Sequence, residues 1–331
     1  MNSKVVSCNN KLTLLDIGAR DGVEWPWDSV SRDELNIILV EPDPDEVKRL
    51  EGLEQGLVLP YALWNEETEL ILNINNSPAT SSIFEANIPF LKQFEDVQRF
   101  KVKKKIAINT KTIDGLSKIG AIDSVDFVKL DVQGGELAIL QGGENFLKKE
   151  IIGLEVETEF APIYKDQPLF NDVDSFVRER LGMELFDIRK VYWKYKQKKY
   201  RPPLKGRLIF ADSLYLRPIP TLDEWLSKMD KEMALKKLHA LIGVSIAYGF
   251  LDYTFAILEA SFSKKYLTKE ERKVLTRRVN NIPKGFYPFK NGNKILYRIF
   301  GVLTHIFKST YKGWGTGDPH LGSRKRSFFW Y

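Results

Sequence analysis

Short apolar runs alternate with segments of helical spacing through the first two thirds of the chain. Segments such as 43–55 and 136–147 space their apolar residues as helices do. The runs typical of buried strands lie at 12–17, 35–40, 57–63, 125–130 and 151–160. A closing strand pair is then predicted at 183–193 and 207–218, and added strands are predicted at 68–75 and 101–113. This order predicts an α/β fold with a mostly parallel sheet and an antiparallel edge.

Polar residues and glycines follow the first two strands. Asp16, Gly18 and Gly22 come at and after the end of the first apolar run, and Glu41 directly follows the second. Ligands of open α/β sheets bind at the carboxyl ends of strands, where a glycine turn admits them and an acid accepts ribose hydroxyls. A nucleotide-like cofactor is therefore expected. An ordinary strand-turn-helix connection and a dinucleotide fold are the alternatives, although the third glycine of G-x-G-x-x-G is absent.

A second group of polar residues follows the strand at 125–130. Asp131 is placed to hold a cofactor amine, to orient an acceptor hydroxyl or to remove its proton, unless it caps the next helix. Glu136 is either a first-turn helix acid or a pocket residue. Glu155 and Glu157 share one face of their strand, so one of them binds the acceptor or acts as a base. A charge pair with Lys129 is the structural alternative.

These motifs together resemble the FkbM family of S-adenosylmethionine-dependent O-methyltransferases. The resemblance covers residues 10–218 and is carried by LDIGARDG (15–22), VEPDPDEVKRL (40–50), YALWNEET (61–68), TIDGL (112–116), FVKLDVQGGELAILQGG (127–143) and GLEVETE (153–159). It implies a Rossmann-like methyltransferase fold with a mostly parallel seven-stranded sheet and an antiparallel edge strand. It also implies S-adenosylmethionine as cofactor and a hydroxyl of a sugar, glycan or glycolipid as acceptor.

The resemblance and the strand ends together give the expected site. The cofactor-binding residues are Asp16, Gly18, Arg20, Gly22, Glu41, Ala62 and Asp131. Asp131 and Glu157 are the expected catalytic residues, either of which would accept the acceptor's proton. Ala62 and Leu63 line the adenine side or pack in the core. Gln133 stands where an acidic residue is more common in the family, and no metal site is expected. The polar segment 75–84 either faces substrate or is a solvated loop.

Charge divides the chain. Residues 261–331 hold 16 Lys or Arg against 3 Asp or Glu, whereas the preceding 260 residues hold 34 against 41. The expected domains are a methyltransferase domain at 1–218 and a basic, mainly helical extension at 219–331.

The single cysteine, Cys8, excludes an intramolecular disulfide, and the N-terminus shows no secretory signal, so a cytoplasmic location is expected. The apolar tract 241–258 is interpreted as a buried helix because polar residues interrupt it.

The basic extension predicts an anionic partner. Residues 221–280 are expected to form helices that pack on the catalytic domain. Residues 293–310 predict a basic amphipathic helix, which lies peripherally on the inner membrane face or docks on its own protein. The three histidines are interpreted as surface or core residues.

Two other classes of function stay open. One is a non-catalytic adaptor that keeps a methyltransferase-like domain and acts through its basic tail. The other is an RNA-directed methyltransferase, which is disfavoured because DVQGGE stands where a nucleobase motif would be expected. The pattern specifies neither the methyl acceptor nor the oligomeric state.

Overall fold

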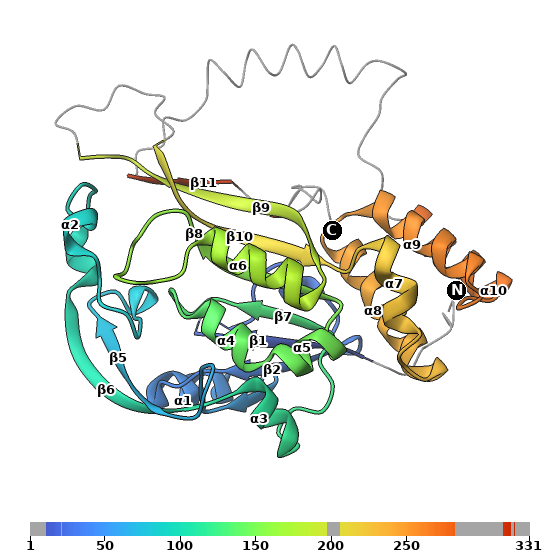
Figure 1. The fold of residues 1–331 in the computed structure, drawn as a ribbon, viewed down its shortest axis with the longest axis horizontal. Helices are drawn as coiled ribbons and strands as arrows, with labels where there is room; N and C mark the ends of the chain where they lie inside the picture. The colour runs from blue at the N-terminus through green and yellow to red at the C-terminus, as the bar shows by residue number, and fades with distance from the viewer. Residues whose placement is uncertain (1–10, 21, 197–205, 282–313, 319–320, 322–331) are drawn as a thin grey trace, which may run out of the picture.

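A main β-sheet forms the centre of the computed structural model (Figure 1) and carries most of the candidate residues. The structure describes residues 11–20, 22–196, 206–281, 314–318 and 321. Eight strands of this described part form the sheet, in the order β11-β9-β10-β8-β7-β1-β2-β3. Their bounds are β1 (Leu12–Ile17), β2 (Leu35–Val40), β3 (Leu57–Leu59), β7 (Phe127–Leu130), β8 (Gly153–Glu159), β9 (Glu184–Trp193), β10 (Arg207–Leu216) and β11 (Gly315–Gly317).

The directions of the strands confirm the expected α/β fold. β3, β2, β1, β7 and β8 are parallel to their neighbours in this series. β10 runs antiparallel to both β8 and β9, and β11 runs antiparallel to β9. The predicted closing pair is thus β9 and β10, with β10 lying inside the sheet. β11 is an additional strand that the pattern did not predict.

The expected third strand at 57–63 is divided between two sheets. β3 belongs to the main sheet, whereas β4 (Ala62–Leu63) joins a second sheet of order β4-β6-β5, with β5 (Glu69–Asn75) and β6 (Val102–Lys111). Pro60 lies between β3 and β4 and has no N–H with which to continue a ladder. The chain turns there, and Tyr61 N donates to the Leu59 carbonyl at 2.9 Å.

Helices cover both faces of the main sheet. One face packs against α3 (Ile113–Lys118), α4 (Glu136–Gly142), α5 (Glu144–Glu150), α6 (Phe170–Phe176) and the π turn η4 (Val177–Leu181). The other face packs against α1 (Pro44–Gly52), α7 (Ile219–Leu226), α8 (Lys231–Ala247), α9 (Leu251–Ser263) and α10 (Lys269–Asn280). The short α2 (Ile88–Leu91) and the 3₁₀ turns η1 (Trp27–Ser29), η2 (Pro78–Thr80) and η3 (Val97–Phe100) complete the elements. Figure 1 shows α7–α10 together at one end of the main sheet and β5 and α2 at the other.

The helices at 219–281 share one core with the main sheet, as expected for residues 221–280. Leu14 on β1 and Phe127 on β7 lie in the same cluster as Leu238 on α8 and Ile257 on α9. The single buried helix expected at 241–258 is instead the end of α8 and the start of α9. The chain breaks between them at Gly249, whose φ of +81° belongs to the left-handed region.

A buried ion pair fixes α8 to the sheet. Lys237 on α8 is fully buried, and its Nζ lies 2.9 Å from Asp126 Oδ1 and 3.1 Å from Glu150 Oε2. The other oxygen of Asp126 accepts a hydrogen bond from the backbone N–H of Thr13 on β1 at 2.9 Å. Lys237 therefore joins α8 to the amino ends of β1 and β7.

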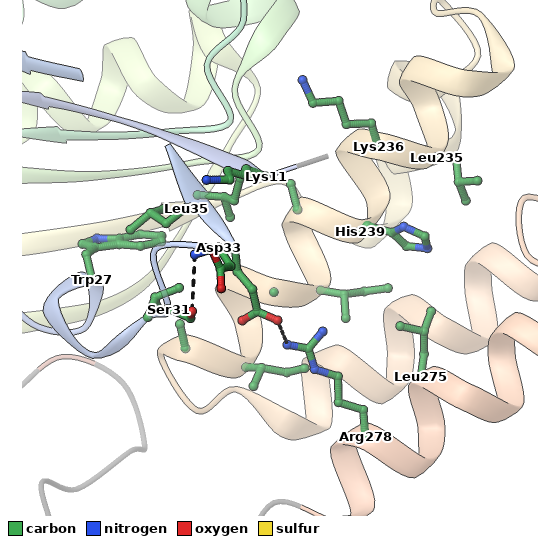
Figure 2. Close-up of a pocket in the computed structure, with 18 of the residues that line it drawn as sticks. Lys11, Trp27, Ser31, Asp33, Leu35, Leu235, Lys236, His239, Leu275 and Arg278 are labelled. Atoms are coloured by element: carbon green, nitrogen blue, oxygen red, sulfur yellow. Dashed lines mark hydrogen bonds and ion pairs between the residues drawn. The ribbon is translucent and has the colours of Figure 1, made fainter. Parts of the chain in front are cut away.

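A cavity of about 780 Å³ lies between the amino ends of β1 and β2 and helices α8 and α10 (Figure 2). Leu35, Leu235 and Leu275 line it, and an ion pair of 3.1 Å joins Arg278 to Glu34 at its side. His239 also lines the cavity, and burial lowers the pKa of its imidazole. Because the cavity is at the amino end of β1, it is separate from the glycine turn that follows that strand.

Two further expectations concern membranes. Within the described residues, no helix has the length and apolar composition needed to cross a bilayer. The basic amphipathic helix expected at 293–310 and the basic segment at 323–331 fall outside the described residues.

The Lys237 ion pair predicts a large stability effect. Lys237→Met removes the cation and leaves Asp126 and Glu150 buried without it, so we expect the free energy of unfolding to fall by about 3 to 5 kcal/mol in urea titrations. Lys231→Met, on the exposed first turn of the same helix, should change it by less than about 0.5 kcal/mol. Equal effects of the two substitutions would contradict the assigned role of the ion pair.

Candidate functional site

Charged side chains lie in two rows across one face of the main sheet, toward the carboxyl ends of the strands. In the first row Asp16 on β1 lies opposite Lys129 on β7 in the strand register, and Lys129 lies opposite Glu155 on β8. In the second row Glu157 on β8 pairs with Asp212 on β10. Residues two apart along a strand share a face, so both rows lie on the same side of the sheet.

Asp16 is a buried carboxylate that lacks hydrogen bonds. It is fully buried, and neither of its oxygens has a hydrogen-bond partner among the described residues. Lys129 Nζ lies 3.8 Å from Asp16 Oδ1 and 3.3 Å from Glu24 Oε2. Burial raises the pKa of Asp16 to about 6, because lost hydration outweighs the attraction of Lys129. The free acceptors of Asp16 therefore favour a ligand that brings positive charge or hydrogen-bond donors.

The turn after β1 needs glycine at two positions. Gly18 has a φ of +82° and Gly22 a φ of +79°. A Cβ on Gly18 would lie 1.9 Å from the carbonyl oxygen of Asp131, and one on Gly22 would lie 2.6 Å from Gln55 Oε1. Both glycines thus combine a left-handed backbone with a close approach that a side chain would block.

Glu41 directly follows β2 and is 5% exposed. Its Oε1 accepts a hydrogen bond from Asp43 N at 2.9 Å, and burial raises the pKa of Glu41. Arg20 lies nearby, with its guanidinium 3.4 Å from Asp43 Oδ2 and 3.6 Å from Glu46 Oε1. The structure therefore places Glu41 at the strand end beside the glycine turn, and it directs Arg20 to the first turn of α1.

The two residues expected near adenine are both buried. Ala62 in β4 pairs with Thr110 on β6, outside the main sheet. Leu63 packs in the core cluster beneath α3 and α4. Core packing is therefore the observed contact of Leu63.

Asp131 and Glu157 lie close together and share one hydrogen-bond donor. Gln133 Nε2 donates to Asp131 Oδ1 at 3.0 Å and to Glu157 Oε1 at 2.7 Å. Glu157 is 7% exposed, whereas Asp131 is half-buried. Burial raises the pKa of Glu157 well above its usual range, and the neighbouring charge of Asp131 adds to the increase. The structure thus brings the two predicted catalytic carboxylates together through a glutamine to which the sequence assigned no role.

Glu136 fastens the turn that follows Asp131. Its carboxylate accepts hydrogen bonds from Val132 N and from Gly134 N, each at 2.9 Å. Burial raises its pKa to about 7, although these backbone donors oppose the increase. Gly135 is the N-cap of α4, so Asp131 does not cap that helix.

Glu155 is held by a residue from the C-terminal helices. The hydroxyl of Tyr248, at the end of α8, donates to Glu155 Oε2. Burial raises the pKa of Glu155 to about 7. In the described part of the chain the ion pairs of Lys129 within 4.0 Å go to Asp16 and Glu24, but the charge of Lys129 still opposes the rise in the pKa of Glu155.

The segment expected to face substrate is attached to the same turn. Ser82 Oγ donates to the Gln133 carbonyl at 2.7 Å, and the hydroxyl of Tyr164 lies 2.9 Å from the Thr80 carbonyl oxygen. Thr80 and Ser82 are buried, which differs from a solvated loop. Residues 75–84 therefore lie against the carboxylates at the edge of the sheet.

These groups define what the site can do chemically. Two carboxylates of these rows have a cation as ion-pair partner. Lys129 pairs with Asp16, and Arg189 on β9 pairs with Asp212. Among the described residues, no three His, Cys, Asp or Glu side chains gather as metal ligands would. A site with more carboxylates than cations can attract a cationic ligand, accept hydrogen bonds from hydroxyls and take up a proton.

Comparison with known families gives one match. The family model described as "Methyltransferase FkbM domain" matches residues 16–184, just over half of the chain. The matched segment contains the glycine turn, Glu41, Asp131 and Glu157. Among curated proteins, none matches the chain significantly.

Several solved structures resemble this one at low identity. The crystal structure of methyltransferase FkbM from Methylobacillus flagellatus has 14% identity and a TM-score of 0.35, and the match covers 61% of this chain and 43% of that chain. A fibrillarin/Nop5p complex has 15% identity and a TM-score of 0.32, with 61% and 72% covered. A TehB-like SAM-dependent methyltransferase from Corynebacterium glutamicum has 11% identity and a TM-score of 0.29, with 62% and 80% covered. This chain spans less than half the length of the first of these proteins.

The glycine turn predicts opposite effects of one substitution at two positions. Gly18→Ala should lower the free energy of unfolding by at least about 2 kcal/mol, because Ala resists the left-handed region and its Cβ overlaps the Asp131 carbonyl. Gly52→Ala in α1, where a Cβ meets nothing within 4 Å, should raise it by about 0.5 kcal/mol. Urea unfolding of both variants tests this, and a neutral Gly18→Ala would contradict the close approach.

Proposed function

The chain belongs to the FkbM methyltransferase family, and we propose that it transfers the methyl group of S-adenosylmethionine to a hydroxyl of a sugar, glycan or glycolipid. The observation that carries this proposal is the group of acids at the strand ends, in which Asp16 has no hydrogen-bond partner among the described residues and Asp131 lies beside Glu157. Such a group suits both a cationic methyl donor and a hydroxyl acceptor.

The residues present fit S-adenosylmethionine. The free acceptors of Asp16 suit its ammonium or sulfonium charge, and Asp131 lies close enough to add to the same negative field. The left-handed backbone at Gly18 and Gly22 shapes the turn along which the cofactor would lie. Glu41, at the end of β2, is placed to accept hydrogen bonds from ribose hydroxyls. When bound, S-adenosylmethionine supplies a methyl group activated by the positive charge on its sulfur.

The protein's part in the chemistry is to orient the acceptor and to receive its proton. Carboxylate oxygens accept hydrogen bonds from hydroxyl groups, so Asp131 and Glu157 can hold an acceptor hydroxyl in one orientation. Either carboxylate can then take the hydroxyl proton. Glu157 suits this role because burial raises its pKa well above its usual range, which makes its carboxylate a stronger base. Asp131 suits it because it is the more exposed of the two.

The acceptor class rests on the family and on the polar lining of the site. Gln133 and the segment 75–84 add amide, hydroxyl and backbone groups next to the carboxylates. Groups of this kind match the several hydroxyls of a sugar better than an apolar acceptor.

Cofactor binding should depend on pH through Asp16. A carboxylate attracts the cationic cofactor and its protonated form does not, so the affinity should fall as the pH drops below about 6, the pKa of Asp16 in the free protein. Calorimetric titrations from pH 5 to 8 measure this. We expect Asp16→Asn to bind at least tenfold more weakly at pH 8 and to lose this pH dependence, because its side chain does not titrate.

The matched control is Asp123→Asn, at an exposed position. It should bind S-adenosylmethionine as the unmodified protein does. An affinity that stays constant from pH 5 to 8, or an Asp16→Asn variant that binds normally, would contradict the assignment of Asp16.

Methyl transfer should depend on Glu157. A radiolabelled methyl-transfer assay against glycans, lipid-linked sugars and RNA identifies the acceptor class. With the best acceptor, Glu157→Gln should lower kcat by a factor of about 10² to 10⁴, because the amide cannot take up the proton. Cofactor affinity should persist in this variant, and Glu51→Gln on the exposed side of α1 serves as control.

The assay also separates the competing classes. Transfer to RNA alone would replace the proposed acceptor. Failure to bind S-adenosylmethionine at all would favour the non-catalytic adaptor.

A further inference from the structure

We propose that Gln133 is a positioning residue whose side-chain amide holds Asp131 and Glu157 together as a pair of carboxylates. This inference rests on the proposed function for its meaning in catalysis. The hydrogen bonds that support it belong to the free protein.

The amide is placed to serve both carboxylates at once. A glutamine amide has two N–H groups, and Nε2 lies 3.0 Å from Asp131 Oδ1 and 2.7 Å from Glu157 Oε1. The opposite orientation would turn the amide oxygen toward two carboxylates, where it would be repelled. Gln133 is therefore a neutral group that offers one donor to each charge.

Two contacts fix the position of Gln133, one to its side-chain amide and one to its backbone. Gln133 Oε1 lies 3.1 Å from the hydroxyl of Tyr164, whose single hydrogen it shares with the Thr80 carbonyl. Ser82 donates to the backbone carbonyl of Gln133 at 2.7 Å. The Gln133 backbone has a φ of +62°, a left-handed conformation that costs free energy in a residue with a side chain. These contacts thus hold the strained backbone of Gln133 in a position from which its amide reaches both carboxylates.

The charges that face Glu157 explain why such a donor is needed. Asp131 after β7, Glu159 on β8, Asp212 on β10 and Glu136 on α4 all raise its pKa. Within the described part of the chain, no lysine or arginine comes within ion-pair distance of Asp131 or Glu157. The nearby cations are otherwise engaged, since Arg189 pairs with Asp212 and Lys129 with Asp16. The amide supplies hydrogen bonds that favour the charged forms without adding a positive charge that would repel a cationic cofactor.

Direct titration of the carboxyl groups tests this inference without an assay of activity. In protein labelled with ¹³C at the Asp and Glu carboxyl carbons, NMR follows each group, and Asp131→Asn and Glu157→Gln assign the two signals. Gln133→Gly keeps the left-handed backbone at no steric cost and removes the amide. It should raise the apparent pKa of Glu157 by about one unit or more.

Gln133→Glu should raise the pKa of Glu157 further, because it adds a third carboxyl group. Gln141→Glu, the same chemical change at an exposed position of α4, should leave both signals unchanged. Tyr164→Phe should cause a smaller increase than Gln133→Gly, since it removes one contact that orients the amide.

Activity measurements test the role of Gln133 in catalysis. In Gln133→Gly the acidic limb of the kcat/KM profile for the acceptor should move to higher pH by the same amount as the pKa of Glu157, and the rate should recover at high pH. A role in folding alone would lower kcat equally at every pH. Unchanged carboxyl titration in both Gln133 variants overturns the inference, whatever the activity. Shifted titration in a protein that transfers no methyl group keeps the role of Gln133 and overturns the proposed function.

Discussion

Negative charge buried at the carboxyl end of the main sheet is the constraint on which the site depends. Asp16 on β1 and Glu155 and Glu157 on β8 lie on one face of the sheet, on either side of β7, and burial raises the pKa of each. An isolated buried carboxylate is costly, so each needs a donor or a cation. The protein supplies Lys129 near Asp16, Tyr248 at Glu155 and Gln133 at Glu157. Asp16 alone of these three acids keeps both oxygens without a hydrogen bond among the described residues, which makes it the natural point for a cationic ligand.

The C-terminal helices belong to this arrangement. α8 reaches the sheet at two depths, since Lys237 joins Asp126 at the amino ends of the strands and Tyr248 reaches Glu155 nearer the carboxyl ends. Apolar residues of α8 and α9 share one cluster with the strands between these contacts. The boundary expected near residue 218 therefore separates two stretches of sequence that share one core. A change in α8 can reach the candidate site through Tyr248.

Local pattern was enough to predict much of the fold and part of the site. The glycine turn, Glu41 and Asp131 were predicted because each follows an apolar strand, and Glu157 because it lies near the carboxyl end of one; parallel strands bring these ends together. Three features had no such local signal. The role of Gln133 depends on an acid 24 residues away, and that of Tyr248 on an acid 93 residues away. The division of the third strand depends on where the chain continues after Pro60.

The sequence by itself determined which residues stand at the strand ends, because a strand's period of two and a glycine turn are written in neighbouring residues. It also determined the family, through motifs that span residues 16–184. Only the tertiary structure decided how the buried acids are held. Their donors come from a left-handed turn and from a distant helix, and the free energy of a buried charge is set by what surrounds it in space.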